Sequence, residues 1–123
     1  MKVNLIQLRR LVMAVALIAI VSVREASAHA ILFEATPARN SIVNGSSVAV
    51  KLRFNVRIDS GRSRLALVYP GGSLHALQVK PQQPAEVVAA DVSDLGPGHY
   101  DLKWQVLASD GHMTQGDIPF AVK

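Results

Sequence analysis

Two parts of the sequence combine residue types that bind metal ions. The first is His29, which directly follows the small residues Ala26-Ser27-Ala28, and the second is the triplet Asp110-Gly111-His112. If this triplet is extended, Asp110 and His112 project to the same side, because side chains in a strand repeat every two residues. Gly111 between them lets the backbone bend or approach a metal ion closely. Imidazole nitrogens and a carboxylate oxygen together indicate metal binding.

Residues 1–28 are expected to be a signal peptide that is cleaved after Ala28. Basic residues open this segment, an apolar run (LVMAVALIAIVSV) follows at 11–23, and Ala26-Ser27-Ala28 provides the small residues of a cleavage site. A membrane anchor is the alternative, but the run is shorter than the roughly 20 residues that span a bilayer. The sequence therefore predicts an exported protein without stable membrane insertion after cleavage.

Cleavage at that point would make His29 the first residue, with a free α-amine. The amine and the ring Nδ1 could then chelate one ion, and His112 and Asp110 would add a third nitrogen and an oxygen. Such a set suits Cu(II), which also heads the affinity series of divalent ions. Met113 is the only methionine after residue 28, so a Cu(I) site of several thioethers cannot be built. The sequence predicts one Cu(II) per mature chain, bound by His29, Asp110 and His112.

The charge of the chain does not indicate a nucleic-acid partner. The 123 residues carry a formal net charge of +4 at pH 7, but three of these units belong to residues 1–28, and the remainder has a net charge of +1. The densest basic stretch, Arg57 to Arg64, lacks the aromatic residues that stack on bases. Cysteine is absent, which excludes disulfides, zinc ribbons, iron–sulfur clusters and thiol catalysis.

The chain after residue 28 is expected to form one small all-β domain. Tyr100, Leu102, Trp104 and Val106 share one face of the clearest strand, and the segment 48–54 also alternates. Other strands are expected at 30–33, 64–69, 74–79, 85–92 and 117–122, with Gly, Pro and Asn turns between them. This spacing predicts a seven-stranded Greek-key sandwich or barrel that is immunoglobulin-like and cupredoxin-like in size.

The remaining histidines and the tryptophan have simpler interpretations. His75 and His99 each follow a turn rich in glycine and proline, so we expect exposed turn or edge residues and not ligands. Trp104 is expected to be a core aromatic residue. A histidine after a leader and an Asp-Gly-His turn can each be incidental as well, which leaves an exported β-sandwich interaction module without metal as an alternative.

Residues 29–123 resemble the CopC family of exported copper-binding proteins. The resemblance is carried by His29-Ala30, Thr36-Pro37-Ala38, the segment 50–54 and above all the block 98–122, where a Gly-x-Tyr-x-x-x-Trp strand precedes Ser-Asp-x-His. It implies an immunoglobulin-like sandwich and a periplasmic location. It also implies a Cu(II) site made by the amine and ring of His29 with Asp110 and His112, the same set that the donor chemistry indicates.

Two features depart from part of this family. Some members have methionine-rich loops for Cu(I), which are absent here, so the chain looks like the Cu(II)-only members. Some members also place a glutamate near the copper where this chain has Val56, so an oxygen ligand is not expected from that position.

The resemblance implies a copper carrier or buffer in copper homeostasis or resistance, and not an enzyme. Its partners would be the copper ion and a membrane copper-transport protein (CopD-like). A copper redox enzyme of the histidine-brace type is the alternative. About 95 residues leave little room for a broad substrate surface, and a close carboxylate favours Cu(II) over the Cu(I) state that oxygen activation needs. The carrier is therefore the preferred hypothesis.

Overall fold

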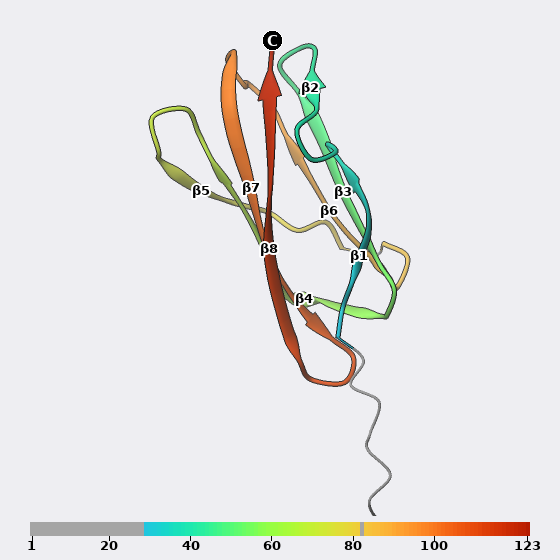
Figure 1. The fold of residues 1–123 in the computed structure, drawn as a ribbon. Coiled ribbons are helices and arrows are strands. Elements are labelled where there is room, and N and C mark those ends of the chain that lie inside the picture. Colours follow the sequence, from blue (N-terminus) through green and yellow to red (C-terminus); the bar gives the residue numbers. More distant parts are fainter. Residues whose placement is uncertain (1–28, 82) are drawn as a thin grey trace, which may run out of the picture.

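A computed structural model describes residues 29–81 and 83–123, which form two stacked β-sheets (Figure 1). The signal peptide expected at 1–28 lies outside these residues. In the part of the chain that is described, no helix is long and apolar enough to cross a membrane. The strands are β1 (Leu32–Thr36), β2 (Ile42–Val43), β3 (Val48–Phe54), β4 (Ile58–Val68), β5 (Leu74–Leu77), β6 (Val87–Val92), β7 (Gly98–Ala108) and β8 (Met113–Val122).

The chain crosses between the two sheets several times. One sheet has the order β1-β3-β6, and the other has the order β2-β8-β7-β4-β5. Neighbouring strands are antiparallel except for β2, which runs parallel to β8. The expected all-β sandwich is confirmed. The described ranges hold eight strands where seven were expected, because the two-residue strand β2 is too short to show an alternating pattern.

Alternation along β3 and β7 builds the core between the sheets. Both strands bury every second residue, as the sequence predicts for strands with one solvent-facing side. Phe54 of β3 meets Trp104 of β7 edge to face, with ring centres 5.3 Å apart, so the two sheets are joined by an aromatic contact. Trp104 is therefore a core residue, as expected. The largest fully buried side chains are Phe54, Leu52, Leu65, Leu67, Leu102, Val88 and Val106.

β4 and β8 begin several residues earlier than the sequence pattern indicates. β4 begins at Ile58 and not at Arg64, because the polar stretch 60–63 leaves the ladder and hides the alternation. β8 begins at Met113 and not at Asp117, although Gly116 has a low preference for strands. Gly116 pairs with Trp104 and leaves the space that the indole ring fills. Both extensions lie toward the end of the sandwich that carries the turn between β7 and β8.

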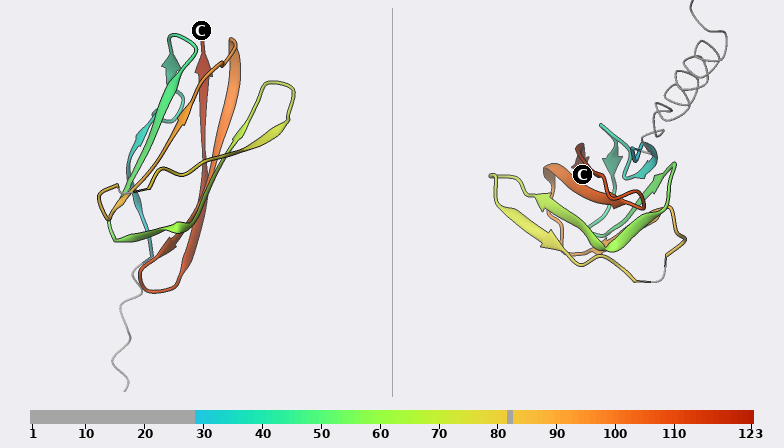
Figure 2. Two further views of the ribbon diagram at one scale, coloured as in Figure 1. Left: turned by 180° about the vertical axis from the view of Figure 1, so that it is seen from behind. Right: turned by 90° about the horizontal axis from the view of Figure 1, so that it is seen from below.

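The start of β1 and the β7–β8 turn lie side by side at one end of the sandwich. Figure 1 shows both at the bottom of the molecule, and Figure 2 shows the same arrangement from behind. The C-terminus of β8 lies at the opposite end. His29 precedes β1, and Asp110 and His112 belong to the turn, so the fold brings the two parts of the predicted metal site together.

Gly116→Ala is expected to destabilise the protein by about 1–3 kcal/mol, because overpacking a filled core forces side chains and backbone to move. A Cβ at this position would lie 2.5 Å from Cζ2 of the Trp104 ring. Urea unfolding followed by circular dichroism measures the loss. Gly96→Ala is the control, since a Cβ there meets no atom within 4 Å. Equal losses in the two variants would contradict this account of Gly116.

Candidate metal centre

His29 is held in place by the two residues that follow it. Ala30 is buried in the core, with 3% of its surface exposed. The backbone N–H of Ile31 donates to Oδ1 of Asn55 at 2.7 Å, and the backbone N–H of Asn55 donates to the carbonyl oxygen of Ile31 at 3.1 Å. These contacts fix the chain one and two residues after His29, while the His29 side chain itself stays exposed.

An ion pair strengthens the attachment of β1 to β3 beyond this point. Nη2 of Arg53 lies 3.0 Å from Oε1 of Glu34. The guanidinium group of Arg53 also lies over the ring of Phe33, 5.5 Å from the ring centre. The hydrogen bond and charge of Arg53 lower the pKa of Glu34 below its ordinary value. Because both side chains are substantially exposed, this pair contributes only weakly to stability.

The β7–β8 turn is closed by backbone hydrogen bonds. The N–H of Ala108 donates to the carbonyl oxygen of His112, and the N–H of Gly111 donates to that of Ala108, both at 2.9 Å. Gly111 has φ +88°, a left-handed conformation that glycine adopts without strain. The N–H of Ser109 donates to the carbonyl oxygen of Arg57 at 3.0 Å, which ties the turn to the chain just before β4.

Asp110 and His112 meet through a turn and not through an extended chain. Oδ1 of Asp110 accepts the backbone N–H of His112 at 3.0 Å, and its Oδ2 lies 2.9 Å from Nδ1 of the His112 ring. Aspartate side chains commonly accept the backbone N–H two residues later in this way, so a turn, and not an extended chain, brings Asp110 and His112 together. The hydrogen bond to Nδ1 leaves Nε2 as the ring nitrogen that His112 can offer to a metal ion.

His29 and His112 are 83 positions apart in the sequence, but their ring centres are 5.3 Å apart, with the ring planes inclined at 58°. A divalent ion binds an imidazole nitrogen at about 2.0–2.1 Å, which places the ring centre about 3.2 Å from the ion. Two rings on one ion then have centres about 4.5 to 6.4 Å apart, for bond angles between about 90° and 180°. The observed separation falls within this range, so the spacing of the two rings is compatible with one shared ion.

The described residues do not present a closed metal cage. Within 29–81 and 83–123, no three His, Asp or Glu side chains are gathered closely enough to hold a metal ion by themselves. The structure brings His29 beside His112 and joins Asp110 to His112. A metal ion would still have to draw these groups together, so the ligand set of His29, Asp110 and His112 stays a prediction.

The two histidines that were not expected to be ligands lie on the surface, and Val56 packs against the core. His75 is exposed on the edge strand β5, where Nε2 lies 3.2 Å from Oγ of Ser73, and His99 is exposed near the start of β7. Both are surface residues, as expected. Val56 is half-buried and packs against the core.

Sequence reasoning missed two residues that hydrogen-bond to the segments carrying His29 and His112. Asn55 holds Ile31, and Ser63, in the first half of β4, accepts the backbone N–H of Leu107 at 3.2 Å. Asn55 follows the end of a recognisable strand, which is an ordinary place for a turn residue. Nothing in the local sequence indicates that its partner lies 24 residues earlier.

Asp110→Ala is expected to speed hydrogen exchange of the His112 backbone amide and to change the tautomer of its ring, because both groups lose their acceptor. Two-dimensional ¹H–¹⁵N NMR of the metal-free protein measures both effects. Asp117→Ala, which removes an exposed carboxylate from β8, is the control. A His112 amide and ring that behave alike in all three proteins would contradict the role given to Asp110.

Comparisons with known proteins agree with this fold. Protein YobA of Escherichia coli K12 is 31% identical over 99 residues, covering 78% of this chain and 80% of YobA, and YobA of Shigella flexneri matches equally well. The crystal structure of CopC from Methylosinus trichosporium OB3b has a TM-score of 0.69 and 29% identity, covering 77% of this chain and 94% of that one. PcoC, described as a methionine-rich copper resistance protein from E. coli, has a TM-score of 0.61 at 22% identity, covering 78% of this chain and all of its own, and supports the fold alone.

The family comparison covers nearly the whole of the described chain. The model of the CopC domain matches residues 32–123, which include the β7–β8 turn with Asp110 and His112. The match begins three residues after His29, so the proposal of His29 as a ligand is supported by the structure and by the donor chemistry and not by the family model. Because the match covers residues 32–123, the chain belongs to the CopC family.

Proposed function

We propose that this protein binds one Cu(II) ion at the end of the sandwich and acts as a copper carrier or buffer. The approach of the His29 and His112 rings to 5.3 Å supports this proposal most directly. Two imidazole rings from distant parts of the chain lie there at a spacing that is compatible with one shared ion. Membership of the CopC family and the donor chemistry both favour copper as the ion.

Each residue has a distinct part in the proposed site. The α-amine and Nδ1 of His29 chelate the ion, and Nε2 of His112 supplies a third nitrogen. In this structure Asp110 accepts two hydrogen bonds from His112, one from the backbone and one from the ring. Nδ1 and Nε2 point to opposite sides of the ring, so the carboxylate gives up its bond to Nδ1 when it binds the ion itself. The amine and both rings must lose their protons to bind, so copper affinity falls as the pH falls.

This proposal includes the processing and location of the protein. The α-amine of His29 becomes available when residues 1–28 are removed, so export to the periplasm and assembly of the site are coupled. A nitrogen-rich site with a carboxylate close to His112 favours Cu(II), which fits a carrier better than an oxygen-activating enzyme. The partner that delivers or receives the copper would be a membrane copper-transport protein.

A protein that begins at His29 is expected to bind one Cu(II) tightly, whereas the same protein with a methionine before His29 should bind at least about 100-fold more weakly. The extra residue removes the chelating amine, and loss of one ligand from a chelate costs several kcal/mol. Competition titration with a chromogenic chelator measures both affinities. Equal affinities would show that the N-terminal amine is not a ligand.

His112→Ala is expected to remove one nitrogen from the coordination of Cu(II), since the site loses the only ring that the β7–β8 turn supplies. Continuous-wave and pulsed EPR of the protein that begins at His29 count the ligating nitrogens. His75→Ala and His99→Ala are the matched controls, because both residues are exposed and away from the turn. Loss of a nitrogen in either control, or none in His112→Ala, would contradict the assignment.

A further inference from the structure

The part of β4 nearest the site does not follow the regular ladder with β7. Asp59 pairs with Leu107 and Arg64 pairs with Gln105, so the four residues 60–63 stand against the single residue Val106. A bulge of this kind interrupts the hydrogen bonds between two strands and weakens their pairing locally. Beyond the bulge, Ile58 pairs with Ala108, the last residue of β7 before the turn.

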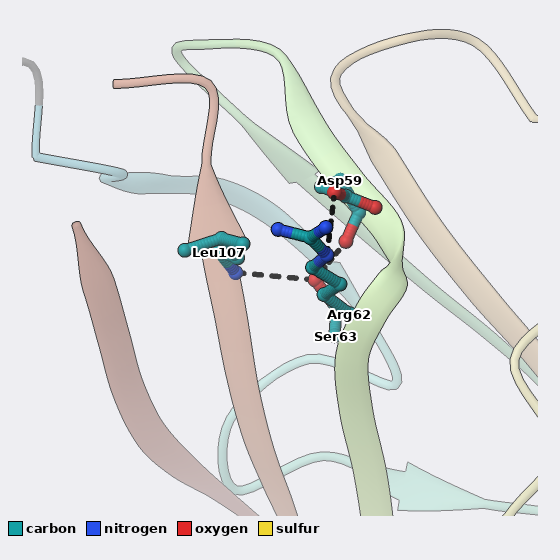
Figure 3. Close-up of polar contacts among 4 residues, drawn as sticks. All are labelled: Asp59, Arg62, Ser63 and Leu107. Atoms are coloured by element: carbon teal, nitrogen blue, oxygen red, sulfur yellow. Dashed lines mark hydrogen bonds and ion pairs between the residues drawn. The ribbon is translucent and has the colours of Figure 1, made fainter. Parts of the chain in front are cut away.

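The side chain of Ser63 bridges the two strands at the bulge. The hydroxyl of Ser63 donates to the carbonyl oxygen of Asp59 at 2.7 Å and accepts the backbone N–H of Leu107 at 3.2 Å. Figure 3 shows Ser63 between the two strands with both bonds drawn. Only 6% of the surface of Ser63 is exposed. Among the residues that the structure describes, Ser63 is the polar residue that is buried. Buried hydrogen bonds are costly to lose, because the groups left behind have no water to bond.

The second polar contact in the bulge is much weaker. Nε of Arg62 lies 3.7 Å from Oδ2 of Asp59, and the two side chains are 78% and 46% exposed. Exposed ion pairs of this kind contribute little to stability. The hydroxyl of Ser63 is therefore the group that ties the two sides of the bulge together, and Arg62 provides a control at the same place in the fold.

The bond to Leu107 leads directly to the metal-binding turn. Leu107 pairs with Met113, the residue after His112, and the next residue, Ala108, donates its N–H to the carbonyl oxygen of His112. On the other side, Arg57 accepts the N–H of Ser109. If β4 separated from β7 at the bulge, the turn would lose this support from Arg57 and Ile58.

We infer that Ser63 is a positioning residue of the copper site, whose hydroxyl holds the β7–β8 turn so that His112 stays facing His29. This inference rests on the proposed function. Ser63 does not contact the ion in it, and acts through Leu107 and the turn. Its loss should therefore speed the release of copper and leave the identity of the ligands unchanged.

The experiment compares variants of the protein that begins at His29. In Ser63→Ala, the dissociation rate of Cu(II), measured by stopped-flow transfer to a chelator, should rise about fivefold, as expected for one lost hydrogen bond. Amide exchange of Leu107 and Ser109 in the copper-free protein should rise as well. Ser63→Thr, which keeps the hydroxyl, should restore both values, and Arg62→Ala should change neither. Ser63→Cys, which keeps the size of the side chain and forms only weak hydrogen bonds, replaces Ser63→Ala if that variant does not fold.

Val92→Ala is the control that distinguishes a specific effect on the β7–β8 turn from a general loss of stability. Val92 is a buried core residue that pairs with Val48 at the other end of the three-stranded sheet, away from β1's first residues. This variant should lose stability without releasing copper faster. The inference is overturned if Val92→Ala and Ser63→Ala speed release equally, or if Ser63→Ala leaves both release and amide exchange unchanged. If the unmodified protein holds no Cu(II) through His112, the proposed function fails first, and the inference fails with it.

Discussion

The continuous pairing of β7 with β8 determines both the core and the position of the turn that carries His112. The register runs without a break from Gly98 opposite Val122 to Leu107 opposite Met113. The inward face of β7 supplies the core, and the closing turn carries Asp110 and His112. The same ladder therefore sets both the packing between the sheets and the position of half of the proposed site. Gly116 illustrates this dependence, because a side chain there would displace the Trp104 ring.

The proposed site joins the two sheets of the sandwich. His29 precedes β1, which belongs to the three-stranded sheet, whereas His112 follows β7 of the five-stranded sheet. Each half has its own support: Asn55 holds the chain after His29, and Ser63 holds the strand before the turn. A copper ion bound by both histidines would cross-link the sheets at their end. Stability of the fold and affinity for the ion should therefore increase together.

The sequence predicts the regular strands and the donor types but not the contacts that position them. β3 and β7 were predictable because their alternation is local and uninterrupted. The start of β4 was not, because its bulge is stabilised by Ser63 through a partner 44 residues away. Donor chemistry selected His29 and His112, yet the chain path that brings their rings together is a property of the whole sandwich. A turn at Asp110 was one of the interpretations of the Asp-Gly-His triplet, because the Asp-Gly pair favours turns over extended chain.

In the proposed site one Cu(II) ion bridges the first residue of the processed protein and the β7–β8 turn. A crystal structure of the copper-loaded protein that begins at His29 tests this arrangement. We expect a single copper about 2.0 Å from the His29 amine, from Nδ1 of His29 and from Nε2 of His112, with the Asp110 carboxylate beside it. Copper bound at His75 or His99, or at His112 without His29, would contradict it.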